Sequence, residues 1–297
     1  MAAATSAAAA AAAADLRKLA ETDVSSEIPQ SQYGPVLLSP PFVYVDGTFN
    51  TRDLGLVPGS PVRAGLAYRS GALHRLTDNG RAVLAGKLGV RRIFDLRSPE
   101  ERASAPEPEL AAHGVEHTWI PSARPDEQPD LRWFVAGGGE GGYRRMYLDA
   151  VDVYRESWKA VLRHVRDRSD EPFLIHCTAG RDRTGVISGL LLALAGASEE
   201  TIVLDYLLSR IGSEPVRVDL LNFAQAGTNA PSHDEPGFYN LCSLRESSWK
   251  AFVEGVQEQY GGFEQFVKND LGFTEDDVAT IKANLTKPRI PAEEDNS

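Results

Sequence analysis

One short segment of the chain combines three local patterns that together restrict its fold. Residues 172–175 form an apolar run that predicts a short buried strand. The residues that follow, Cys177–Arg183, are small or charged and predict a tight loop. An apolar stretch over Val186–Leu194 then predicts a buried helix. A strand, a tight loop and a helix in this order are typical of an α/β fold, with the loop at the carboxyl edge of a sheet.

Strand and helix patterns alternate through the first two thirds of the chain, so we expect a fold of the α/β class. We expect these further elements: strands over 62–69, 90–96 and 115–120, helices over 77–88 and 143–168, and helices after Ser198, over 247–260 and 263–271, and after Thr274. If the strands that end near Asp95 and Cys177 are parallel, their carboxyl ends share one edge of the sheet, where ligands bind in such folds.

The two ends of the chain differ in composition from the rest. Residues 1–35 begin with an alanine tract and continue with polar sequence, which predicts a disordered tail with at most a short helix over 16–22. Residues 288–297 are polar and predict a flexible tail. We therefore expect one domain over residues 36–287.

Composition narrows the class of protein. The net charge of −11 argues against nucleic acid as a partner, because a general nucleic-acid surface is basic. The alanine tract lacks the basic and leucine-rich parts of a signal peptide, and the chain has no apolar run of about 18 residues. We therefore expect a cytoplasmic protein without a membrane span, and the sequence makes no prediction of its oligomeric state.

The cysteine and histidine spacings carry a separate prediction. Cys177 and Cys242 cannot form a disulfide framework, and the histidines show no metal-binding spacing. We expect neither a metal nor another cofactor. Cys242 is interpreted as a small buried side chain.

The loop has the chemistry of a phosphate site. Cys177 would supply a thiolate nucleophile, which cations and a helix N-terminus favour. The loop N–H groups can cradle phosphate oxygens, and the planar fork of Arg183 suits bidentate phosphate binding. Thr184 could place a hydroxyl on the sulfur and help to discharge a phosphocysteine. Because the whole chain is acidic, anions must be attracted locally, and the expected substrate-binding residues are Thr178, Ala179, Gly180, Arg181, Thr184, Arg52 and Arg97.

The general acid stays open between two aspartates. Asp182 lies inside the loop, and Asp95 ends a neighbouring expected strand. Either residue could protonate a leaving oxygen or serve as the structural partner of an arginine. His176 is interpreted as a side chain that shapes the loop through the backbone. Arg52 and Arg97 could hold the fold rather than contact substrate.

Several motifs carry a resemblance to a known family. They are His176–Gly185, Phe49–Leu56, Tyr68–Gly71, Phe94–Ser98 and Asp205–Arg210. Together they resemble the cysteine-dependent tyrosine/serine phosphatases of bacteria and fungi, the type of the mycobacterial tyrosine phosphatase B, over roughly residues 40–287.

The resemblance implies a tyrosine-phosphatase-like central sheet flanked by helices, with extra helices in the C-terminal third. It also implies that Cys177 is the nucleophile, that Arg183 binds phosphate, and that Asp182 and Asp95 assist. The sequence departs from the family pattern at Arg181, where many members have lysine, and at Thr51, which is inserted in the first motif.

The expected activity is hydrolysis of phosphomonoesters, with a phosphorylated protein as the first candidate substrate, on tyrosine or with dual specificity. A phosphoinositide is the alternative substrate. A catalytically weak phosphate-binding module is the alternative of another class, although such a module would be expected to lose Cys177 or Arg183, and both are present.

Overall fold

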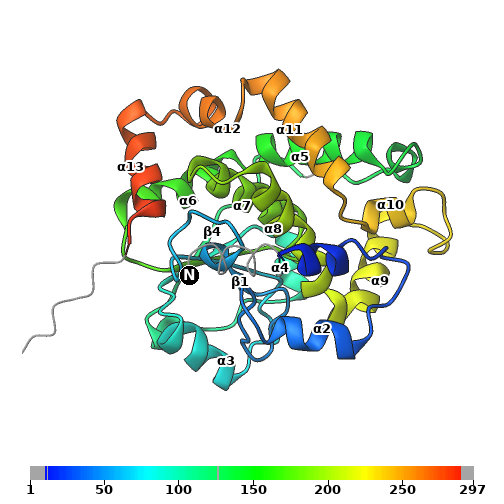
Figure 1. Cartoon of the computed structure of the whole chain (residues 1–297), viewed down its shortest axis with the longest axis horizontal. Helices are drawn as coiled ribbons and strands as arrows, with labels where there is room; N and C mark the ends of the chain where they lie inside the picture. Colours follow the sequence, from blue (N-terminus) through cyan, green and yellow to red (C-terminus); the bar gives the residue numbers. More distant parts are fainter. Residues whose placement is uncertain (1–10, 12, 126, 289–297) are drawn as a thin grey trace, which may run out of the picture.

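A five-stranded sheet forms the centre of the computed structural model, which describes residues 11, 13–125 and 127–288 (Figure 1). Its strand order is β1-β2-β5-β3-β4. β2 and β3 both pair parallel with β5, β3 pairs parallel with β4, and β1 pairs antiparallel with β2. The strands are β1 (Arg52–Asp53), β2 (Ala67–Ser70), β3 (Arg92–Asp95), β4 (Glu116–Trp119) and β5 (Phe173–His176). The fold is α/β, as the sequence predicts.

The register of the parallel strands brings their carboxyl ends together. His176 at the end of β5 pairs with Ser70 on one side and with Asp95 on the other. β5 is central and fully buried, which fits its continuous apolar sequence. The prediction that the strands before Asp95 and Cys177 share an edge is therefore confirmed.

Helices surround the sheet (Figure 1). They are α3 (Asp78–Ala82), α4 (Pro99–Ser104), α5 (Glu140–Val153), α6 (Arg155–Asp167), α7 (Asp182–Leu194), α8 (Glu199–Gly212), α9 (Arg217–Thr228), α10 (Phe238–Cys242), α11 (Glu246–Tyr260), α12 (Phe263–Gln265) and α13 (Glu275–Thr286). The extra helices expected in the C-terminal third are present. α9 and α10 lie where the sequence patterns indicated no helix.

The helix starts follow local side-chain chemistry. Thr77, Ser198 and Thr274 each accept a bond from a backbone N–H in the first turn of the helix that they precede, as their positions predict. Ser98 does the same for α4, where Glu101 completes a capping box. These caps fix where α3, α4, α8 and α13 begin.

α7 is the central helix of the core. Nearly all of its residues are buried, in agreement with its uniformly apolar sequence. It packs on β2 and β5 and between α5 and α8. The indole of Trp249 lies so close to Gly189 that a Cβ there would be 2.3 Å from it. The helix after the loop is therefore held in a fixed place.

The expected long helix over 143–168 is two helices. It breaks at Tyr154, whose φ of −102° and ψ of 21° end α5 before α6 begins. Tyr154 is buried, and its hydroxyl lies 3.3 Å from the Arg183 guanidinium. Because no glycine or proline marks the break, the apolar periodicity alone could not reveal it.

The N-terminal segment, defined as residues 13–37, is folded against the domain. It contains a helix over 13–20 and α2 (Gln30–Leu37), and it runs beside α8, α9 and α10 (Figure 1). Its residues Ala20, Val24 and Ile28 are buried. The expected disordered tail over 1–35 is therefore wrong for residues 13–35. Residues 1–10 and 12, and residues 289–297 of the flexible tail expected over 288–297, lie outside the described residues.

Buried charges on α8 and just after it explain why this polar segment is ordered. Arg210 donates hydrogen bonds to the carbonyl oxygens of Thr22 and Ser26, and the Ile28 N–H donates to Glu214. These partners are distant in sequence, so composition did not predict them.

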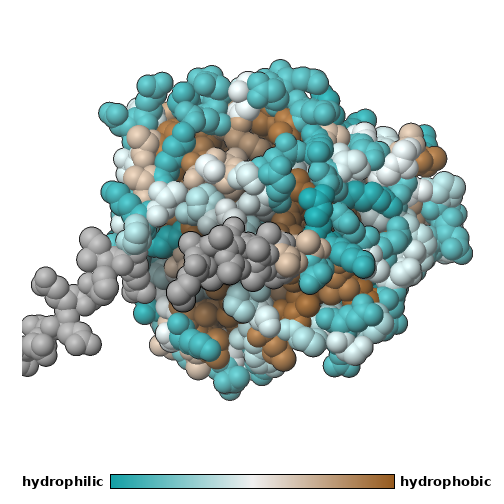
Figure 2. Space-filling model, viewed as in Figure 1, coloured by the Kyte–Doolittle hydropathy of each residue, from teal (hydrophilic) through white to brown (hydrophobic). Residues whose placement is uncertain are grey.

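On the face in Figure 2, hydrophilic residues dominate the rim and hydrophobic residues lie between them in patches. None of the helices in the described part of the chain is long and apolar enough to cross a bilayer.

Candidate active site

The loop after β5 is held from behind. Asn50 donates to the carbonyl oxygens of Ala179 (3.2 Å) and Gly180 (3.0 Å), and Arg69 donates to that of Gly180 (2.8 Å). Gly180 has a φ of 66°, and a Cβ there would lie 2.3 Å from the carbonyl oxygen of Ser70. The loop carbonyls are thus held on the side of Asn50 and Arg69, and the backbone N–H groups are left to face the opposite side. Backbone N–H groups that face one point in this way form a binding site for an anion.

Arg52 belongs to the support of the loop. It is fully buried and donates to Asp205 of α8 (2.8 Å) and to the Ser209 hydroxyl (2.9 Å). Asp205 also pairs with Arg69. Burial and the nearby Arg69 charge lower the pKa of Arg52 to about 10. The structure thus places Arg52 behind the loop, where it pairs with Asp205.

Arg183, in the first turn of α7, is paired with a residue that the sequence analysis missed. Its guanidinium donates to both carboxylate oxygens of Glu101, at 2.6 Å each, and to the carbonyl oxygen of Leu96 at 2.9 Å. The Thr178 hydroxyl donates to the same carboxylate at 2.5 Å. Burial alone would raise the pKa of Glu101, but the bonds from Arg183 and Thr178 lower it to about 2.

Glu101 could have been recognised only in part. The Ser98-x-x-Glu101 spacing is a capping box, which predicts the start of α4. It does not predict that the glutamate reaches the loop. In the structure, Glu101 reaches the loop because α4 follows β3 at the edge of the sheet where the loop also lies.

Cys177 lies at the end of β5 and is only 2 % exposed. It interacts electrostatically with the Arg183 guanidinium. Thr184, in the first turn of α7, is fully buried, and its hydroxyl has no hydrogen-bond partner among the described residues. The nucleophile expected from the sequence and its phosphate-binding arginine are therefore brought together.

The two candidate acids lie in different surroundings. Asp182 opens α7, is half-buried, and accepts a hydrogen bond from the Tyr147 hydroxyl at 2.7 Å. That hydroxyl is in turn 2.9 Å from the hydroxyl of Tyr206. Burial raises the pKa of Tyr147, so it stays a neutral donor. The Tyr147 hydroxyl thus orients Asp182, and Asp182 also interacts electrostatically with the neighbouring Arg181.

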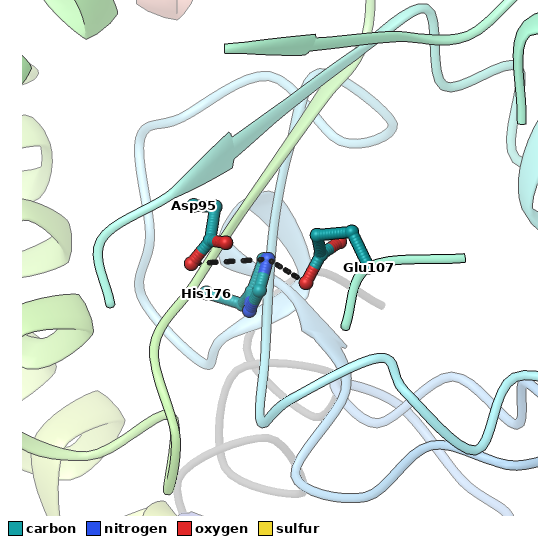
Figure 3. A group of neighbouring side chains, drawn as sticks. All are labelled: Asp95, Glu107 and His176. Atoms are coloured by element: carbon teal, nitrogen blue, oxygen red, sulfur yellow. Dashed lines mark ion pairs between the residues drawn. The ribbon is translucent and has the colours of Figure 1, made fainter. Parts of the chain in front are cut away.

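Asp95 is part of a buried charge cluster (Figure 3). It accepts two bonds from Arg97, at 2.9 and 3.0 Å, and forms an ion pair with Arg102 at 2.8 Å. Burial would raise the pKa of Asp95, but His176 and Arg97 lower it. Arg97 also pairs with Glu107, so both residues are occupied within the cluster.

His176 connects this cluster to the loop. Its Nε2 lies 3.4 Å from Glu107 and 3.8 Å from Asp95 (Figure 3). Its Nδ1 lies 3.3 Å from the carbonyl oxygen of Cys177. Burial would lower the pKa of His176, but Glu107 and Asp95 raise it. A protonated His176 can therefore donate to the backbone of the nucleophile and to Glu107 together.

The same cluster contains residue types that bind cations. Asp95, Glu107 and His176 bring ligand-type atoms within 4.8 Å of one another. Arg97 and Arg102 already pair with the carboxylates, so a metal ion would have to displace them. The cluster fits an internal ion network better than a metal centre.

The remaining loop arginine and the second cysteine lie side by side. Arg181 is 9 % exposed and lines a small cavity together with Cys242, Arg210 and Val24. Burial raises the pKa of Cys242 to about 11, so this thiol stays protonated. Its place in a small apolar cluster agrees with the interpretation of Cys242 as a buried apolar side chain.

Comparison with known proteins defines the class. The sequence model of the tyrosine phosphatase family matches residues 43–287, so the chain belongs to this family. It is a cysteine-dependent phosphatase.

Two relatives show how far the likeness extends. The chain is 31% identical to a tyrosine-protein phosphatase of Nostoc commune, over 73% of either chain. It is 30% identical to the triple specificity protein phosphatase PtpB of Mycobacterium tuberculosis, over 80% of this chain and 97% of that one. The solved catalytic core of Siw14 aligns with 59% of this chain and 86% of its own, at 18% identity and a TM-score of 0.33.

Proposed function

We propose that the protein hydrolyses phosphomonoesters of proteins, on tyrosine or with dual specificity, through a phosphocysteine on Cys177. The observation that carries this proposal is the position of Arg183, which Glu101 orients beside the buried cysteine. Arg183 and the loop N–H groups bind the phosphate oxygens and stabilise the charge that develops during transfer.

The reaction has two steps. The Cys177 thiolate attacks phosphorus, the bond from phosphorus to the leaving oxygen breaks, and Asp182 in its acid form protonates that oxygen. A water molecule then attacks phosphorus and gives its proton to Asp182, and the bond from sulfur to phosphorus breaks. The free hydroxyl of Thr184 can donate to the departing sulfur.

Asp182 is favoured over Asp95 as the acid because Asp95 is held by arginines and Asp182 belongs to the loop itself. Asp95 pairs with two arginines, and their charges hold it ionised at neutral pH. An ionised carboxylate has no proton to donate. Asp182 instead lies half-buried within the phosphate-binding segment itself, at the start of the helix that follows the loop.

Among the expected substrate-binding residues, Thr178, Ala179, Gly180 and Thr184 keep their proposed place around the phosphate. Arg52 and Arg97 are proposed to support the site through Asp205 and Asp95. Arg181 is proposed to add positive charge near the loop. A phosphoinositide remains the alternative substrate, and a reducing compartment such as the cytoplasm would keep Cys177 a free thiol.

The test compares wild type with Cys177→Ser on p-nitrophenyl phosphate, a set of phosphopeptides and a set of phosphoinositides. We expect turnover by wild type and its loss in the variant, together with a phosphocysteine trapped by acid quenching of wild type. Turnover at the wild-type rate by Cys177→Ser would show that the mechanism is wrong. Tight phosphopeptide binding without turnover by wild type would favour a phosphate-binding module.

A further inference from the structure

A large apolar cavity adjoins the phosphate loop. Its volume is about 390 Å³, within the range of small-ligand pockets. It extends from Thr178 of the loop and Glu101 of α4 to Leu220 and Phe223 of α9, and Phe49 forms part of its wall. The cavity therefore begins beside the loop, at Thr178, and ends on a helix that the proposed reaction does not use.

The charges that line this cavity are already paired. Arg97 is held by Asp95 and Glu107, and Glu101 is held by Arg183. Arg97 and Glu101 are thus both paired within the site itself, so neither is available to a ligand in the cavity.

The two other basic residues of the lining, Arg75 and His74, form no cluster of cations, since Arg75 lies beside the acidic Asp219. Arg75 lies 3.7 Å from Asp219, and both line the cavity. Burial and the neighbouring Arg75 lower the pKa of His74, which keeps it neutral at physiological pH. An inositol ring with several phosphates would need unpaired cations here, because additional phosphates bind to arginine or lysine clusters. An apolar group needs only the wall of Phe49, Leu220 and Phe223.

One residue of the lining is unusually exposed for its type. Phe223 is 51% exposed and lines the cavity, so an apolar group of the substrate would cover its ring. Val218, on the same helix, is 59% exposed but is not part of the lining. The two residues allow the effect of the cavity to be separated from that of general surface hydrophobicity.

We propose that this cavity is a specificity subsite for an apolar side chain next to the phosphorylated residue of a protein substrate. The proposal rests on the proposed phosphatase function and names the substrate sequence that this function prefers. Phosphopeptides with an apolar neighbour bind better than those with an acidic neighbour and better than phosphoinositide headgroups.

The test uses two phosphotyrosine peptides that differ only in having leucine or aspartate beside the phosphotyrosine. Binding to Cys177→Ser is measured by fluorescence anisotropy, and kcat/KM is measured with the active enzyme. We expect about a tenfold preference for the leucine peptide in both measurements, because a partly buried leucine contributes roughly that much. Adding Phe223→Ser should reduce the preference to about twofold, whereas Val218→Ser should leave it unchanged.

The controls separate the two proposals. Thermal unfolding and kcat/KM on p-nitrophenyl phosphate should be the same in wild type, Phe223→Ser and Val218→Ser, because neither residue belongs to the proposed catalytic machinery. A binding preference without turnover would support the subsite and refute the proposed function. Equal binding of both peptides, or equal effects of the two serine variants, would refute the subsite. Higher kcat/KM on a soluble short-chain phosphoinositide than on the leucine peptide would also refute it.

Discussion

Both carboxylate oxygens of Glu101 accept hydrogen bonds from Arg183, and one of them also accepts a hydrogen bond from the Thr178 hydroxyl. The pair fixes the plane of the guanidinium before substrate binds. It also ties α4 to the loop, so the end of β3 and the end of β5 support the same arginine.

Replacing Glu101 by glutamine should therefore weaken catalysis without removing the nucleophile. A glutamine offers one acceptor oxygen instead of two, so the guanidinium loses its fixed plane. We expect kcat/KM on p-nitrophenyl phosphate to fall about tenfold in Glu101→Gln, which corresponds to about 1.4 kcal/mol of lost transition-state stabilisation. Steady-state kinetics at neutral pH checks this, and a rise in kcat/KM would mean that the carboxylate competes with the phosphate instead.

The identity of the acid can be read from the dependence of kcat on pH. If Asp182 donates the proton, wild-type kcat on a phosphotyrosine peptide should fall at alkaline pH, and Asp182→Asn should lose this alkaline limb. We also expect kcat itself to fall by about 10² to 10³ in this variant. The effect should be smaller on p-nitrophenyl phosphate, whose leaving group needs less protonation. An alkaline limb that survives in Asp182→Asn and disappears in Asp95→Asn would assign the acid to Asp95.

The His176–Glu107 pair predicts a dependence of stability on pH. The pKa of His176 in the folded state is raised above 6.5. The stabilisation by the pair is therefore complete at a pH below the unfolded-state pKa, and it is lost as the pH rises through the folded-state pKa. Glu107→Gln should therefore lower Tm more at about pH 6 than at about pH 9. A smaller difference in Tm between wild type and Glu107→Gln should persist at alkaline pH, because Arg97 loses its ion pair with Glu107 at every pH.

Thermal unfolding across this pH range checks the prediction. Glu116 pairs with Arg92, but its side chain is 71% exposed, so Glu116→Gln is a matched control with little expected effect. A Glu107→Gln effect that does not change with pH would show that His176 is neutral in the folded protein.

Asp205 is the single acid between two buried arginines, Arg52 and Arg69. Asp205→Asn would leave both cations without a charged partner, and we expect the free energy of unfolding to fall by about 3 to 5 kcal/mol. Because Arg69 also holds the carbonyl of Gly180, activity should fall even under conditions where the variant is folded. Urea unfolding checks the first effect, with Asp170→Asn as control. Asp170 is 76% exposed in its pair with Arg63, so this change should stay within about 0.5 kcal/mol.

The parts of the fold that the sequence predicted depend on neighbours in the chain. The apolar run before Cys177, the small loop residues and the apolar helix after Arg183 are local patterns. The same holds for the helix starts at Thr77, Ser198 and Thr274, where the capping side chain bonds a backbone N–H within the first turn.

The parts that the sequence did not predict depend on distant partners. Glu101 and Arg183 are 82 positions apart, and Arg52 and Asp205 are 153 apart. Periodicity and spacing cannot identify such pairs, because many arginines and acids could combine. For this reason Arg52 and Arg97 could be selected as important from sequence, but not separated into phosphate ligands and supports.

The docked N-terminal segment has a practical consequence for the limits of the folding unit. The family match begins at residue 43, after this segment. A fragment begun there would expose the apolar surface that Ala20, Val24 and Ile28 cover, and Glu214 would lose the backbone N–H of Ile28. The smallest independently stable piece should therefore start near residue 13, upstream of the boundary that homology suggests.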